Sequence, residues 1–419
     1  MSNTVLGLIF LIVIIVCYMT RIVPVPMAAV LGSMAFAFPK INTYAQSFTG
    51  YGTEAMPIAI AGMGIALAFK ETGFDKPFGE KILSIFQGNK NKMLIAMMVV
   101  SAVIGAYVSP IAGAAVFIPI VTAVAKASEG RIKAKFFVLP VTFAAVVGGS
   151  LTDNTITAAV RDLLAAENIA PIQMFTTAGP AVILLVLLAA YFLTIGSKLQ
   201  EKVLSGMTDE HFGEEMPVEK IKTEKMKVAG ILFLISIICI LTKITTAAIF
   251  LLLGSCAMIT VKCIPLKKSL YYTNFEAIVI MGANFGIATG ISNSGAGKWI
   301  ADYIIDMFGG AGASPFAMLA ALCLAAIILG NVMHSPAVCA MLIPTGLSLA
   351  AAADVSPWPF IVGVILSASA AFALPIGPVA VAMSLYAGYK YTDYVLIGGL
   401  FSVICLIAIV AATPIFYPF

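Results

Sequence analysis

Val147-Gly-Gly-Ser-Leu-Thr-Asp-Asn-Thr-Ile-Thr-Ala-Ala159 is the stretch of sequence that decides how this chain folds. It lies within a long apolar run, yet it contains two glycines, one acid and several hydroxyl and amide side chains. An unpaired backbone amide is costly in hydrocarbon, so non-helical backbone at membrane depth occurs only where protein or a water-filled cavity surrounds it. The stretch therefore predicts the unwound middle of a broken helix that lines a binding site.

The composition of the whole chain places this stretch in a membrane. Of the 419 residues, 61% are hydrophobic and 11% are charged, which is more apolar surface than one soluble core can bury. The net charge of +4 is small and scattered, so we expect no nucleic-acid partner. The seven cysteines show no CxxC spacing, so neither disulfides nor a zinc site are predicted. The amino terminus lacks a basic region and a cleavage site, and we expect a retained span there.

Apolar runs that cross or nearly cross about 30 Å of hydrocarbon recur along the chain. Two pairs of runs are joined only by short polar turns, which predicts two helical hairpins. The one long polar segment, 198–227, predicts a cytoplasmic linker that joins two halves, residues 1–197 and 228–419. The runs cover residues 5–20, 23–38, 56–69, 93–108, 111–126, 136–160, 176–195, 228–241, 245–261, 275–291, 315–333, 337–353, 360–386 and 394–416. The run at 360–386 is expected to be broken at 374–378.

Three sequence elements of the first half recur in the second half in the same order. The offset is nearly constant, at 225 residues for the polar hairpin tips and 223 residues for the broken helices. Recurrence of three elements in order indicates an internal duplication. The matching segments are 60–64 with 280–284, 109–119 with 334–344, and 143–160 with 366–383.

Positive charge predicts how the two halves are oriented, because cytoplasmic loops are enriched in Lys and Arg. Lysines and an arginine flank both ends of the first hairpin, whereas Asp354 is the only charge in the two segments that flank the second, 309–314 and 351–357. We therefore expect the first hairpin to enter from the cytoplasm and the second from outside. The predicted fold is an all-α polytopic membrane protein of about ten spans and two re-entrant hairpins, with both termini outside. Because each half has an odd number of spans, five, the two halves start on opposite sides of the membrane, and the repeat must be inverted.

Phe372-Ala-Leu-Pro-Ile-Gly-Pro-Val-Ala-Val-Ala-Met-Ser-Leu-Tyr-Ala-Gly-Tyr389 follows the second hairpin. It is similar to the Leu-Pro-x-x-Thr-Pro-Pro-Asn segment, followed by Gly-Tyr, of the divalent anion:sodium symporters. Together with the paired hairpins, the chain resembles this family of the ion transporter superfamily over nearly its whole length. The resemblance implies a homodimer in the bacterial inner membrane that moves a small organic anion, such as a di- or tricarboxylate, with Na⁺ or H⁺ by an elevator mechanism.

The chain departs from that family at the residues that bind substrate and sodium. Each hairpin tip of those symporters reads Ser-Asn-Thr, whereas the tips here are Ser109-Pro110-Ile111 and His334-Ser335-Pro336. In the second broken helix, Pro378-Val-Ala-Val381 replaces Thr-Pro-Pro-Asn. The first half keeps its polar residues from Ser150 to Thr155. The departures therefore bear on the substrate and the coupling ion rather than on the fold.

The two tips and the two helix breaks predict one site near the midplane, where half-helix N-termini present unpaired N–H groups to an anion. No Lys or Arg lies in these segments, and unwound carbonyls there offer oxygen ligands to sodium. No cofactor is expected, apart from Na⁺ if sodium is the coupling ion. The candidate substrate-binding residues are Ser109, Pro110, Thr152, Asn154, Thr155, His334, Ser335, Pro336, Gly377 and Pro378, and the candidate coupling-ion residues are Ser109, Gly148, Gly149, Ser150, Asp153, Ser335 and Ala373.

Several of these residues have a simpler structural interpretation. Asp153 predicts a proton or cation site because an acid at membrane depth is costly, but it also has the chemistry of a helix cap. His334 is either a titrating site residue or a cap, and Ser109 and Ser335 either bind ligand or make the turn. Asn284, like Asn331, is expected to bond between helices.

Two other classes of function remain open. On the same fold, a cation/proton antiporter would bind its cation at Asp153. An intramembrane enzyme ranks last, because the polar residues at membrane depth include no Ser/His/Asp set, paired aspartates or HExxH motif. We therefore predict a transporter and no enzymatic activity.

Overall fold

The computed structural model describes residues 2–128, 133–152, 160–161, 164, 169–205, 221–242, 244–271, 273, 275–387 and 389–419. Within these ranges all regular secondary structure is helical. Six of the described helical segments are long and apolar enough to cross a membrane, or seven if one bent pair counts as a span. The prediction of an all-α polytopic membrane protein is confirmed.

The helices of the first half begin and end within a few residues of the predicted runs. Polar caps fix several ends: the Ser2 side chain accepts a hydrogen bond from the backbone N–H of Val5, and Asn89 accepts from those of Asn91 and Lys92. The elements are α1 (Asn3–Thr20), α2 (Val25–Ala35), α3 (Tyr44–Phe48), α4 (Ala55–Thr72), α5 (Asp75–Ile85), α6 (Lys90–Tyr107), α7 (Pro110–Ala127), α8 (Lys135–Gly149), α10 (Ala178–Leu193) and α11 (Ile195–Ser205).

The second half follows the same order of long helices. Its predicted hairpin forms from α17 and α18, and Pro315 opens α17 behind the cap residue Ser314. The elements are α12 (Met226–Thr242), α13 (Ala247–Thr260), α14 (Leu266–Tyr271), α15 (Phe275–Ser294), α16 (Ala296–Met307), α17 (Pro315–Gly330), α18 (Ser335–Ala352), α19 (Trp358–Ser369), α20 (Val379–Ala382), α21 (Tyr391–Tyr394) and α22 (Leu400–Phe416).

The amphipathic helices α5, α11 and α16 are not covered by the predicted apolar runs, because polar residues interrupt their hydrophobic pattern. α5 and α16 each follow a glycine with a left-handed backbone, Gly73 at φ +69° and Gly295 at φ +77°, which ends the preceding span and turns the chain. α11 follows α10 after a bend of 52° and covers the start of the segment predicted as a polar linker.

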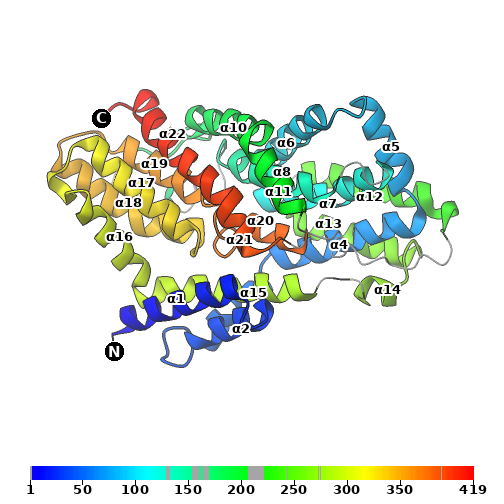
Figure 1. Cartoon of the computed structure of the whole chain (residues 1–419), viewed down its shortest axis with the longest axis horizontal. Helices are drawn as coiled ribbons and strands as arrows, with labels where there is room; N and C mark the ends of the chain where they lie inside the picture. Colours follow the sequence, from blue (N-terminus) through cyan, green and yellow to red (C-terminus); the bar gives the residue numbers. More distant parts are fainter. Residues whose placement is uncertain are drawn as a thin grey trace.

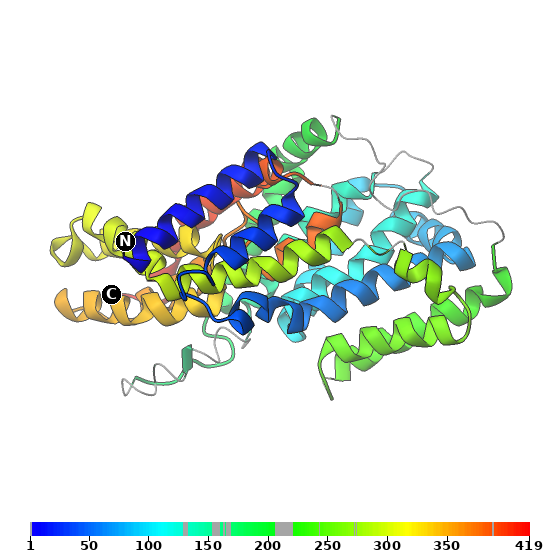
Figure 2. The ribbon, with the colours of Figure 1, turned by 90° about the horizontal axis from the view of Figure 1, so that it is seen from below.

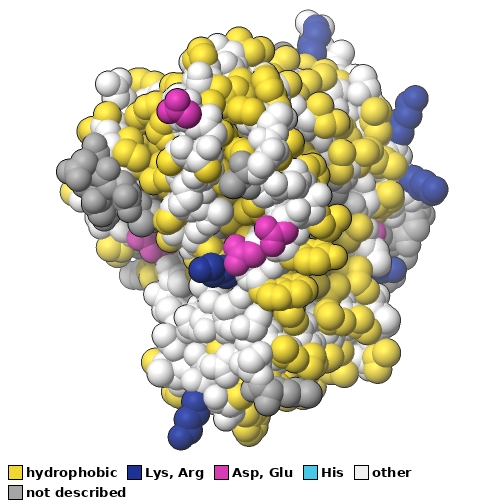
Figure 3. Space-filling model, turned by 90° about the vertical axis from the view of Figure 1, so that its left-hand side faces the viewer, with side chains coloured by type: hydrophobic (Ala, Val, Ile, Leu, Met, Phe, Trp, Pro, Cys, Tyr) yellow, Lys and Arg dark blue, Asp and Glu magenta, His cyan; other side chains and the backbone are white. Residues whose placement is uncertain are grey.

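The molecule has two distinct ends along its long axis (Figure 1). Both termini lie at one end, together with α16, α17 and α18, whereas α5 and α14 lie at the other (Figure 1 and Figure 2). Figure 3 looks onto the end that holds the termini, where a few charged side chains are dispersed among hydrophobic ones. The two termini thus lie at the same end of the molecule.

Each hairpin packs on the helix that follows it in the sequence. α6 and α7 pack on α8, and α17 and α18 pack on α19. A Cβ atom added to Gly105 would lie 2.2 Å from the carbonyl oxygen of Ala145, and one added to Gly330 would lie 2.9 Å from that of Ala368. These two close contacts are separated by the same offsets, 225 and 223 residues, that relate the two halves of the sequence.

Candidate functional site: two hairpin tips and two helix breaks

The first helix break lies directly on the tip of the first hairpin. α8 ends at Gly149, within the predicted break, and the Thr152 hydroxyl donates a hydrogen bond to the carbonyl of Ala106. A Cβ atom on Gly149 would lie 2.5 Å from Cγ of Pro110. Glycine is needed here because no side chain fits between the break and the tip.

Gly148 meets the other arm of the same hairpin. A Cβ atom at this position would lie 2.2 Å from the carbonyl oxygen of Ala102. Its own carbonyl accepts from the backbone N–H of Leu151 at 2.9 Å. The carbonyl of the neighbouring Ser150, which is buried, accepts from the Thr177 hydroxyl at 2.6 Å. Thr177, which the sequence analysis did not identify, therefore holds the end of the break.

Ser109 closes the first tip by capping α7. Its hydroxyl accepts a hydrogen bond from the backbone N–H of Ala112 at 3.1 Å, which is the turn-forming alternative considered for this residue. Its carbonyl accepts from the backbone N–H of Gly113 at 3.0 Å. Asp153, Asn154 and Thr155 lie outside the described residues, and their roles stay predictions.

The second helix break is longer than predicted. The sequence placed it at 374–378, but α19 ends at Ser369 and the chain is non-helical until α20 begins at Val379. The buried Ser402 of α22 explains the difference, because its hydroxyl accepts from the backbone N–H of Phe372 at 3.0 Å and donates to the carbonyl of Ala370 at 2.8 Å. Backbone groups that a side chain satisfies in this way no longer need a helix.

Asn331 ties the second tip to the second break. Its side-chain oxygen accepts from the backbone N–H of Leu374 at 2.8 Å, and its own carbonyl accepts from that of Gly377 at 3.0 Å. Its side-chain nitrogen donates to the carbonyl of Ile327 at 2.8 Å. In the first half the direction is reversed, since Thr152 in the break reaches back to the tip. Each half therefore joins its hairpin to its helix break through polar side chains, Thr152 in the first half and Asn331 with His334 in the second.

The rest of the second tip rests on the same break. The Ser335 hydroxyl donates to the carbonyl of Ala368 at 2.9 Å. A Cβ atom on Gly377 would lie 2.2 Å from the carbonyl oxygen of Gly330. Among the other candidates, Pro336 lies in the first turn of α18, Pro378 is the residue before α20, and Ala373 lies within the non-helical segment.

His334 presents one ring nitrogen with no partner. Its Nδ1 lies 2.9 Å from the carbonyl oxygen of Gly377, and because a carbonyl only accepts, Nδ1 carries the hydrogen. Nε2 is buried without a hydrogen-bond partner, and the ring packs at 4.0 Å between centroids on Phe285. His334 occupies the N-cap position of α18, and its carbonyl accepts from the backbone N–H of Val338 at 3.1 Å, but its side chain makes no capping hydrogen bond.

Asn284 brings two further elements to the second break. Its side-chain nitrogen donates to the carbonyl of Pro375 at 3.1 Å, and its side-chain oxygen accepts from the hydroxyl of Tyr18 at 2.7 Å. Asn284 and Asn331 thus bond between elements, as predicted. No sequence signal pointed to Tyr18, whereas Ser402 could have been noticed as a hydroxyl within an apolar run.

The two halves of the site are joined through α20 and one ring stack. α20, which follows the second break, packs against α7 and α8, and the Phe143 and Phe372 rings are 4.4 Å apart between centroids. The second break therefore adjoins the first hairpin as well as its own. Among the described residues, no group of three or more His, Cys, Asp and Glu side chains could hold a metal ion.

Several carbonyls at the first tip and the two breaks already accept hydrogen bonds, among them those of Ala106, Ser109, Gly148 and Pro375. A carbonyl oxygen has two lone pairs, so each retains acceptor capacity. Helix N-termini, carbonyl oxygens and one imidazole nitrogen lie around the two breaks. The hairpin tips and the helix breaks contain no Lys or Arg.

Comparison with known families decides what kind of protein has this arrangement. The family model of the CitMHS citrate transporters matches residues 9–311 and also residues 237–419. The chain belongs to the CitMHS family. The family description is that of transporters, as the resemblance to the divalent anion:sodium symporters implied, and not of enzymes.

Relatives of this CitMHS protein include three transporters. The sodium-dependent dicarboxylate transporter SdcS of Staphylococcus saprophyticus is 22% identical over 395 residues, which cover 86% of this chain and 76% of SdcS. The uncharacterised transporter YfbS of Escherichia coli is 26% identical over 159 residues, 38% of this chain and 26% of YfbS. An uncharacterised Synechocystis transporter is 25% identical over 197 residues, 46% of this chain and 32% of its own length. The chain thus aligns with about a third or less of the last two.

Proposed function

We propose that this protein is a secondary active transporter that carries a small organic anion, such as a di- or tricarboxylate, together with Na⁺ or H⁺. The family description and the printed name of SdcS support a carboxylate substrate. The observation that carries the proposal is the way both tips and both breaks are held together without a Lys or Arg among them. The N-terminal N–H groups of α7 and α18 would attract a carboxylate.

His334 is the described residue best placed to take part in coupling. Its Nδ1–H is fixed on Gly377, so the neutral ring presents the lone pair of Nε2, which has no partner. That nitrogen either accepts a hydrogen bond from a substrate hydroxyl or takes up a proton. Protonation would add a positive charge beside the N-terminus of α18 when an anion arrives. His334 and Asp153 are therefore the two residues proposed to distinguish proton from sodium coupling.

We further propose that residues 1–197 and 228–419 are inverted repeats, joined by 198–227, that move as an elevator in a homodimer. The matched contacts of Gly105 with Ala145 and of Gly330 with Ala368 support the duplication. The common end of the two termini is consistent with an even number of spans. The resemblance to the divalent anion:sodium symporters is the support for the elevator, the homodimer and the bacterial inner membrane.

Ligand-dependent melting and flux measurements test this function. The purified protein is heated with citrate, succinate, sulfate or no addition, each in sodium and in potassium buffer, because a ligand that binds only the folded state raises the melting temperature. Radiolabelled citrate uptake into proteoliposomes is then measured under a sodium gradient and under a pH gradient. We expect a carboxylate to stabilise the protein and one gradient to drive uptake.

Two results would contradict the symport proposal. Proton movement that responds to a cation gradient without any organic anion would favour the antiporter alternative, with Asp153 as its cation site. Carboxylate uptake that neither gradient accelerates would leave transport in place but remove cation coupling.

A further inference from the structure

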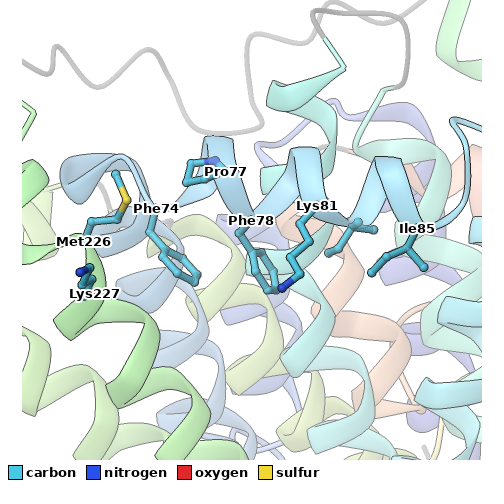
Figure 4. Close-up of a pocket in the computed structure, with 8 residues that line it drawn as sticks. Phe74, Pro77, Phe78, Lys81, Ile85, Met226 and Lys227 are labelled. Carbon is cyan, nitrogen blue, oxygen red and sulfur yellow. The ribbon is translucent and has the colours of Figure 1, made fainter.

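A surface groove lies where α5 meets the first turn of α12, far from the hairpin tips in the sequence (Figure 4). Its volume is about 530 Å³, and eight residues line it. Two of them are exposed lysines, Lys81 from α5 and Lys227 from α12. The other six are apolar, namely Phe74, Pro77, Phe78, Ile82, Ile85 and Met226. The groove thus combines a hydrocarbon-like lining with two positive charges.

The apolar lining continues down an exposed face of α12. Ile231, Leu234, Ile235 and Ile238 are each at least half exposed, and their spacing places them on one side of the helix. α12 belongs to a segment that is long and apolar enough to cross the membrane, so this face contacts lipid chains. A hydrocarbon chain that lies in the groove therefore continues along α12 without leaving an apolar surface.

The charged rim of the groove favours an anion. No Asp or Glu is among the eight lining residues, although Glu80 and Glu224 are close in sequence. Figure 4 shows the Lys81 side chain running from α5 beside the Phe78 ring, whereas Lys227 lies with Met226 at the other end of the groove, near Phe74. Positive loop charge predicts that this end faces the cytoplasm, where anionic lipids attract a lysine near the surface by about 1 kcal/mol.

We propose that this groove binds an anionic phospholipid, with its headgroup held by Lys81 and Lys227 and an acyl chain along the aromatic lining and α12. The groove is also connected to the first hairpin, because α5 packs on α7, which is one of the two helices of that hairpin. A Cβ atom on Gly79 of α5 would lie 2.2 Å from the carbonyl oxygen of Ala123 of α7. A lipid in the groove therefore braces the helix against which the first hairpin rests.

Lipid binding by the full-length protein tests this proposal. Protein in a neutral detergent is titrated with phosphatidylglycerol or with zwitterionic phosphatidylcholine, and bound lipid is counted by native mass spectrometry. We expect Lys81→Gln/Lys227→Gln to bind phosphatidylglycerol about 30-fold more weakly, the factor that about 1 kcal/mol per lysine gives for two lysines. Phosphatidylcholine binding should not change.

Lys76→Gln/Lys225→Gln is the matched control. It removes the same charge from α5 and from the turn before α12, but neither lysine lines the groove. The control should keep phosphatidylglycerol affinity within about threefold of the parent protein. Equal loss in both double variants would overturn the proposal in favour of general surface charge. Unchanged binding in the groove variant would overturn it, and so would inorganic phosphate that raises the melting temperature as much as the lipid does.

Discussion

The tie between Asn331 and the second helix break gives the sharpest prediction. Replacing the buried Asn331 by Ala removes the oxygen that accepts from the backbone N–H of the half-buried Leu374 at 2.8 Å. A buried N–H left without a partner costs about 1–3 kcal/mol. The helical bond from the Asn331 backbone and the carbonyl that accepts from Gly377 both survive, because they do not involve the side chain. The substitution also removes the side-chain bond to the Ile327 carbonyl, which lies within α17, so the bond to Leu374 is the one lost between α17 and the break.

The size of this loss sets the expected kinetics. In the tied form of the protein the Asn331 side chain holds the break at Leu374, and in the untied form it does not. A loss of 1–3 kcal/mol lowers the ratio of the tied to the untied population by a factor of about 5 to 150. If substrate binds only the tied form and the untied form predominates in the variant, the KM of Asn331→Ala rises more than twofold and by no more than that factor. Uptake of radiolabelled citrate into proteoliposomes measures KM, and a fluorescence melt in detergent measures the loss of stability.

Asn293→Ala is the matched control for this experiment. Its side chain donates to Asn42 between two elements at 3.1 Å, so it loses a comparable bond outside the hairpins and breaks. We expect both variants to melt earlier, but only Asn331→Ala to raise KM. A KM for Asn331→Ala within twofold of the parent, at a normal level of folded protein, would refute the idea that this tie organises the site.

Three further substitutions test the site and the packing. Asp153→Asn should fold but lose transport or its pH dependence, measured as uptake from about pH 5.5 to pH 8.5; an unchanged profile would leave Asp153 as a cap. His334→Gln removes the only imidazole of the described tips, and it should flatten the pH profile of uptake more than it changes the melting temperature. Gly105→Ala places a Cβ atom 2.2 Å from the Ala145 carbonyl oxygen and should lower the free energy of unfolding by about 1–3 kcal/mol. Gly52→Ala, where a Cβ atom would have no atom within 4 Å, should change it little. Equal melting temperatures of the two variants would contradict the packing account.

The sequence predicted the long helices well because hydrophobicity is a local property. α1 was expected at residues 5–20 and runs over Asn3–Thr20, and the hairpin arm expected at 111–126 runs over Pro110–Ala127. The amphipathic α5 was missed, because half of its residues are polar and it does not register as an apolar run. The left-handed Gly73, which separates it from α4, was not used as a signal.

By itself, the sequence determined that this chain is a polytopic helical protein with two hairpins and two breaks, since apolar runs and their polar interruptions are written along the chain. Only the tertiary structure decided which residues satisfy the broken backbone. The partners are remote in sequence, as with Tyr18 and Asn284, or Ser402 and Ala370, so no local pattern could identify them. In hydrocarbon each exposed backbone group must find such a partner, and the place where it finds one sets where a helix can end.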